Sequence, residues 1–113
     1  MSPDKYFSIA KEIAIKKDDY RSHRLAAVGL RKDGVLVSAS NGQALDKCAE
    51  AHAEVRLARK LTPFSDVFVV RVRRSGELAM AIPCHNCQQV LRSRGVSRVF
   101  FTTAPTQWGI LSL

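Results

Sequence analysis

The chain has 113 residues, 46% of them apolar, and its 18 Lys and Arg against 10 Asp and Glu give a formal net charge of +8. This length predicts one compact domain over residues 1–113. No apolar run reaches the roughly 18 residues of a membrane span, and the N-terminus lacks the pattern of a secretory signal, so we expect a cytoplasmic protein. The positive charge favours anionic partners, such as nucleotide phosphates or nucleic acid.

The first predicted element is an amphipathic helix over residues 2–17, where apolar residues recur every three or four positions. Two strands are predicted next, over residues 24–30 and 35–40. Asp33-Gly34 lies between them and is a strong hairpin signal, so these two strands should be antiparallel.

The rest of the chain alternates between helix and strand patterns. Helices are predicted over residues 49–61 and 84–94, and strands over residues 66–72, 96–102 and 108–113. Residues 77–82 fit either a short strand or an ordered loop. The strand over residues 66–72 is a nearly continuous apolar run, as in a central strand covered on both faces. The alternation requires right-handed parallel crossovers and predicts a three-layer α/β/α sandwich with a mixed sheet.

Two short stretches about thirty residues apart carry the chemically active side chains. They are His52-Ala53-Glu54 and Pro83-Cys84-His85-Asn86-Cys87. Together they match H-x-E and P-C-x-x-C, the signature of zinc-dependent nucleobase deaminases. One imidazole and two thiolates make three protein ligands, which leaves the fourth position of zinc for a water. Cys-x-x-Cys alone is a weak signal, but the proline, the H-x-E and the spacing make the combination strong.

Both stretches lie at predicted helix N-termini that follow strand ends, where open α/β sheets bind ligands. Cys84 and Cys87 are three residues apart, so on a helix they share one face and can reach the same ion. His52 and Glu54 are two residues apart and do not share a flank, so they converge only if the site lies off the helix end. In that arrangement, zinc activates a water and Glu54 transfers its protons.

Most of the chain resembles the cytidine and deoxycytidylate deaminase superfamily. The segments that carry the resemblance are residues 23–28, Ser40-Asn41-Gly42, His52-Ala53-Glu54 and residues 83–91. The resemblance implies a cytidine deaminase-like sheet of five strands in the order 2-1-3-4-5. It also implies Zn2+ held by His52, Cys84 and Cys87, with Glu54 as the proton shuttle.

The resemblance further implies that Asn41 contacts the sugar, with Ala53 and Pro83 beside the substrate. In this superfamily, free-nucleoside enzymes usually carry Cys-Ala-Glu at the first ligand, and deoxycytidylate, tRNA-adenosine and polynucleotide deaminases carry His-x-Glu. The chain contains both Cys48-Ala49-Glu50 and His52-Ala53-Glu54. The eleven-residue spacing from Asn41 selects His52.

The expected activity is hydrolytic deamination of cytosine in a free nucleoside or nucleotide. His52 and the excess positive charge favour a phosphorylated substrate, whereas the short tail with its predicted hairpin resembles the nucleoside enzymes. The family also implies a homo-oligomer.

Three alternatives stay open. The protein could deaminate cytosine or adenine in single-stranded nucleic acid, or it could be a zinc-stabilised nucleic-acid-binding module without catalysis. The zinc site could also be closed and structural, with a fourth protein ligand in place of the water. That ligand could be Cys48, which would share a helix face with His52, or it could be His85. His23 and Arg24 fit a structural role better than a binding role.

Overall fold

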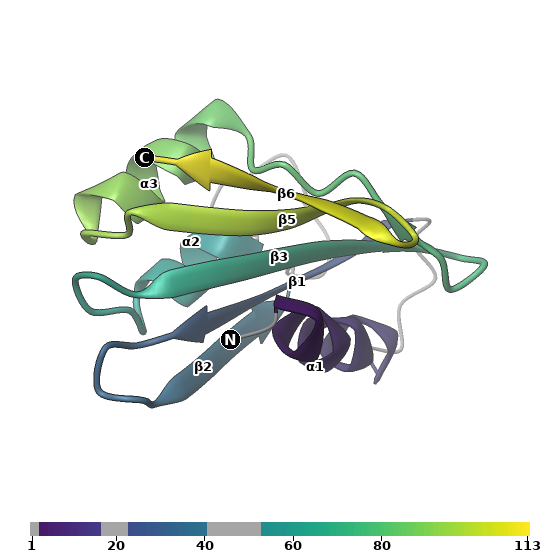
Figure 1. The fold of residues 1–113 in the computed structure, drawn as a ribbon, viewed down its shortest axis with the longest axis horizontal. Helices are drawn as coiled ribbons and strands as arrows, with labels where there is room; N and C mark the ends of the chain where they lie inside the picture. Colours follow the sequence, from purple (N-terminus) through teal and green to yellow (C-terminus); the bar gives the residue numbers. More distant parts are fainter. Residues whose placement is uncertain (1–2, 17–22, 41–52) are drawn as a thin grey trace.

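The computed structural model describes residues 3–16, 23–40 and 53–113 (Figure 1). The helices are α1 (Pro3–Lys16), α2 (Ala53–Ala58) and α3 (His85–Ser93), and the strands are β1 (His23–Leu30), β2 (Leu36–Ser40), β3 (Asp66–Arg73), β4 (Leu78–Ala79), β5 (Arg98–Ala104) and β6 (Gln107–Ser112). Within these ranges, no helix has the length and apolar character that crossing a membrane requires.

The strands form one mixed sheet whose main path runs β2-β1-β3-β5-β6. β1 is antiparallel to both β2 and β3, β3 is parallel to β5, and β5 is antiparallel to β6. Numbered without β4, this path is the predicted order 2-1-3-4-5. β4 adds a sixth strand of two residues, antiparallel to β3 and outside the main path. The undecided segment at residues 77–82 therefore contains a short strand.

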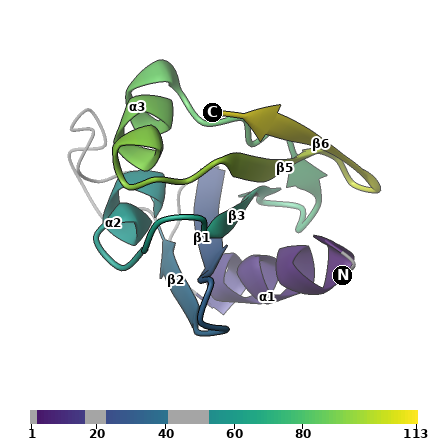
Figure 2. The ribbon, with the colours of Figure 1, turned by 60° about the vertical axis from the view of Figure 1, so that its left-hand side comes forward.

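Helices lie on both faces of the sheet, with α1 on one side and α2 with α3 on the other (Figure 2). Under α1, the ring of Phe68 stacks on those of Tyr6 and Phe100, each with centroids 4.7 Å apart. On the opposite face, Leu57 of α2 and Leu91 of α3 are fully buried in the second half of the core. The predicted three-layer sandwich is confirmed.

β3 is the central strand and is buried on both faces. Val67 and Val69 belong to the half of the core under α2 and α3, while Phe68 and Val70 belong to the half under α1. Burial of each such side chain contributes about 1.5–3 kcal/mol to folding. Burial on both faces, as predicted, therefore explains the continuous apolar run of this strand.

Two helix ends show how the chain packs around the site. α3 stops before Gly95, as predicted; this residue has φ of +84°, and a Cβ there would lie 2.9 Å from the Cα of Pro63. α2 ends at Ala58 rather than at the predicted residue 61, because the N–H groups of Lys60 and Leu61 bond to carbonyls only three residues back. The predicted start at residue 49 lies outside the described residues.

Candidate metal and catalytic centre

The described parts of the two motif stretches come together between α2 and α3, on the sheet face opposite α1 (Figure 2). Ala53 and Glu54 lie in the first turn of α2. Cys84 is the N-cap residue of α3, in an extended conformation, and its carbonyl accepts a hydrogen bond of 2.9 Å from the N–H of Gln88. Glu54, Cys84 and Cys87 are therefore placed by the beginnings of two neighbouring helices.

Cys84 and Cys87 turn their thiols toward each other. Their Sγ atoms are 3.4 Å apart, which one turn of α3 brings about. Cys87 is fully buried, whereas Cys84 is exposed. Because zinc–sulfur bonds are about 2.3 Å long, both sulfur atoms can reach a single ion.

Glu54 is the buried acid next to these thiols. It is 4% exposed, and its carboxylate hydrogen-bonds with the thiol of Cys87. Burial raises the pKa of the Cys87 thiol, and the negative charge of Glu54 and the hydrogen bond with Cys84 raise it further. A divalent cation would reverse this effect by stabilising the thiolates, so the donor set fits zinc.

The predicted third ligand, His52, lies outside the described residues, as do Asn41 and Cys48. Accordingly, the described ranges contain no group of three His, Cys, Asp or Glu side chains that could hold a metal ion. The role of His52, the sugar contact of Asn41 and the alternative ligand Cys48 therefore stay predictions.

His85 points along the outside of α3. It is exposed, and its Nε2 lies 3.0 Å from Nε2 of Gln89 in the next turn. Cys87, in contrast, is buried beneath the same helix. This geometry argues against His85 as the fourth ligand of a closed site.

Pro83 and Ala53, the predicted neighbours of the substrate, are both buried. The carbonyl of Pro83 accepts a hydrogen bond of 2.9 Å from Nε2 of Gln88, which fixes the chain as it enters α3. The sequence alone gives no sign of this role for Gln88, although the residue directly follows Cys87 in the motif segment. Whether Ala53 and Pro83 touch a substrate stays a prediction.

Arg94, at the end of α3, ties the two helices of the site together. Its Nε donates to the carbonyl of Ala58 over 2.8 Å, and its Nη2 donates to the carbonyl of Arg59 over 3.3 Å. These carbonyls lie at the C-terminal end of α2, where helical carbonyls lack partners within the helix. The sequence does not reveal this role, because nothing local indicates a partner 36 residues away.

Arg94→Ala is expected to weaken zinc binding about tenfold and to lower the free energy of unfolding by about 1–3 kcal/mol. The physical reason is that α2 loses its tie to the helix that carries both thiols. Competition with a chromogenic chelator measures the affinity, and urea unfolding measures the stability. Arg92→Ala, which removes an exposed arginine from α3, should change neither quantity. Unaltered zinc affinity in Arg94→Ala would show that core packing alone holds the two helices in place.

Comparison with known proteins identifies the family. Residues 1–103 match the family described as the cytidine and deoxycytidylate deaminase zinc-binding region. No curated protein gave a match to the sequence.

Solved structures share the fold. The cytidine deaminase from Burkholderia pseudomallei is similar with a TM-score of 0.72 and 22% identity, over 99% of this chain and 93% of that one. The cytidine deaminase from Mycobacterium leprae has a TM-score of 0.62 and 21% identity, over 97% and 93% of the two chains. The enzyme from Mycobacterium tuberculosis has a TM-score of 0.60 and 20% identity, over 92% and 89%.

The family match spans both motif stretches and nearly the whole described fold. It makes Zn2+ the cofactor, in agreement with the paired thiols and the adjacent carboxylate. On this evidence, the chain belongs to the family of cytidine and deoxycytidylate deaminases that is defined by this zinc-binding region.

Proposed function

We propose that this protein hydrolyses the amino group of cytosine in a free nucleoside or nucleotide, to give the uracil product and ammonia. The observation that carries this proposal is the contact of the buried Glu54 with Cys87, at the point where α2 and α3 begin. Deamination needs a carboxylate held next to the metal-bound water, and this packing supplies one.

His52, Cys84 and Cys87 would hold the zinc ion, whose chemistry is to make a bound water nucleophilic at neutral pH. Glu54 accepts one proton of the attacking water and passes it to the ring nitrogen. It then takes the remaining proton of that water from the newly added hydroxyl group and gives it to the departing amine. The water oxygen thereby replaces the nitrogen on the ring carbon, the carbon–nitrogen bond breaks and ammonia leaves. Because Glu54 is buried, its proton has little access to bulk solvent.

Asn41 would contact the sugar, and Ala53 and Pro83 would border the base. A free substrate is supported by the aromatic side chains of the described residues, since a polynucleotide site uses exposed rings on which bases stack. Phe100 and Phe101 are buried. Phe64 is 69% exposed, but its N–H bonds to the carbonyl of Gly95 beyond the end of α3, away from the helix beginnings that carry the thiols and Glu54. Trp108 is 40% exposed, but its ring packs near Phe7 and Phe100 in the aromatic cluster on the α1 face, opposite the site.

The protein would act as a homo-oligomer. Trp108 and Ile110 of β6 are 40% and 51% exposed, and β6 is the last strand of the described sheet path. Large apolar side chains on an outer strand suit a contact with a second subunit.

A substrate panel tests the proposal. The zinc-loaded protein is incubated with cytidine, deoxycytidine, their monophosphates, adenosine and a cytosine-containing oligonucleotide, and ultraviolet absorbance and ammonia release are followed. We expect turnover of at least one free cytosine compound, with kcat in the usual enzymatic range of about 1–10³ s⁻¹. Turnover of the oligonucleotide alone would favour the nucleic-acid deaminase. Salt-dependent oligonucleotide binding without any turnover would favour the binding module and contradict catalysis.

A further inference from the structure

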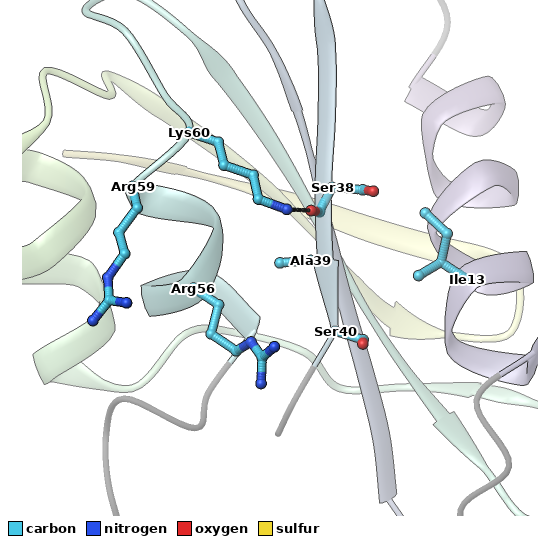
Figure 3. Close-up of a pocket in the computed structure, with 7 residues that line it drawn as sticks. All are labelled: Ile13, Ser38, Ala39, Ser40, Arg56, Arg59 and Lys60. Atoms are coloured by element: carbon cyan, nitrogen blue, oxygen red, sulfur yellow. Dashed lines mark hydrogen bonds between the residues drawn. The ribbon is translucent and has the colours of Figure 1, made fainter. Parts of the chain in front are cut away.

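The main path of the sheet ends in β2 on one side and β6 on the other, and the two outer strands differ in how their edges are protected. An unpaired edge exposes backbone N–H and carbonyl groups to other strands, and proteins often guard it with lysine or other charged side chains. β2 is guarded in this way. Nζ of Lys60 donates to the carbonyl of Ser38 over 2.6 Å, and Arg56, Arg59 and Lys60 line a pocket of about 590 Å³ beside the strand (Figure 3).

β6 lacks such a guard. Its residues, Gln107–Ser112, include no charged side chain and no proline, and no described residue pairs with its outer edge. Trp108 and Ile110 are 40% and 51% exposed. An uncharged outer strand with large exposed apolar side chains is the kind of edge that pairs readily with another strand. The strand therefore has the character of an interface.

The register of β6 on β5 decides which backbone groups can pair with another chain. The N–H of Leu113 bonds to the carbonyl of Ser97 over 3.0 Å, on the side of β5. In an antiparallel pair, residues that bond to the neighbouring strand alternate with residues whose N–H and carbonyl groups point away from it. The groups of residues 109 and 111 therefore point to β5, and those of residues 108, 110 and 112 point outward. This outward set is symmetric about its middle residue, Ile110.

We propose that β6 pairs edge to edge with β6 of a second copy of this chain, in antiparallel orientation, so that the two sheets become one. The inference rests on the homo-oligomer of the proposed function and assigns its interface. When Ile110 lies opposite its counterpart, Trp108 lies opposite Ser112 of the second copy, and each outward N–H meets an outward carbonyl. The two Ile110 side chains then contact each other across the pair.

Charge favours a second copy of this strand over a charged partner. The formal net charge is +8, so most surfaces of two copies repel each other. β6 allows approach without ionised side chains, because Arg98, on the neighbouring strand, is held by Asp66 through hydrogen bonds of 3.1 and 2.9 Å. Since Lys60 guards the opposite edge, the pairing closes as a two-fold dimer instead of extending into a filament.

Sedimentation velocity of the purified protein over a range of concentrations tests the pairing. We expect the wild type to dimerise, and Ile110→Lys to weaken the association by at least about tenfold, because two like charges would face each other across the contact. Val35→Lys is the matched control. Val35 is exposed to a similar degree, 46%, and lies just before the guarded strand β2, so this variant adds the same charge and should associate like the wild type.

Amide hydrogen exchange of the wild type reads the pairing directly and does not depend on whether a variant folds. The N–H of Ile110 should exchange at least about tenfold more slowly at concentrations where the dimer forms than after dilution to the monomer. The N–H of Leu111, which points to β5, should be protected in both states. Equal, fast exchange of the Ile110 N–H in dimer and monomer would contradict the pairing.

The outcomes separate this inference from the proposed function. A dimer that persists in Ile110→Lys, with a fast-exchanging Ile110 amide in the wild type, would place the subunit contact on another surface and leave the homo-oligomer intact. A monomeric wild type would refute both the pairing and the homo-oligomer. Turnover of cytosine compounds by such a monomer would support the deaminase on its own, whereas a β6 dimer without turnover in the substrate panel would refute the deaminase alone.

Discussion

Glu54→Gln is expected to lower kcat for cytosine deamination by at least about 100-fold and to leave the bound zinc unchanged. The amide has nearly the shape of the carboxylate, so it fills the buried position beside Cys87, but it cannot accept the proton of a water molecule. Ammonia release measures turnover, and atomic absorption of the purified protein measures the zinc content.

The control for this variant is Glu12→Gln, which neutralises an exposed acid of α1 on the other face of the sheet and should keep full activity. Loss of zinc together with activity in Glu54→Gln would make Glu54 part of the metal site rather than the proton shuttle. Activity near that of the wild type would place the proton transfer on another group.

Cys87→Ser should weaken zinc binding by more than about 100-fold, because even residues that only support zinc ligands cost about 10–100-fold when they are replaced. The side chain is fully buried at the start of α3, with its sulfur 3.4 Å from that of Cys84, so serine in its place removes one of the two paired sulfur ligands. Zinc binding stabilises the folded state, so the variant should also unfold at a lower temperature. Chelator competition and thermal unfolding with and without added zinc measure both effects.

Cys48→Ser is the matched control, since it removes the cysteine that the open three-ligand site does not use. It should bind zinc as tightly as the wild type and retain turnover. An equal loss of zinc in Cys48→Ser and Cys87→Ser would instead establish a closed site of four protein ligands, which has no position for the reacting water.

The sequence by itself determined the succession of elements, the zinc cofactor and the pairing of the two thiols. Periodicity located α1, the pattern of Asp33-Gly34 located the turn between β1 and β2, and the apolar run of residues 66–72 identified the strand that is buried on both faces. The spacing of Cys84 and Cys87 predicted that their thiols share one side of a helix, and the structure brings them to 3.4 Å. These features are local, because they depend on backbone geometry and on residues within one or two turns of each other.

Only the tertiary structure decided the features that join distant parts of the chain. The contact of Glu54 with Cys87 and the bonds from Arg94 to the end of α2 each connect segments more than thirty residues apart. The two-residue β4 and the early end of α2 likewise depend on what packs beside them. The pocket that Arg56, Arg59 and Lys60 line beside β2 also depends on the tertiary structure, since it exists only once α2 has docked on the sheet. Such contacts are set by packing and by hydrogen bonds between elements, for which a single sequence holds no repeating local pattern.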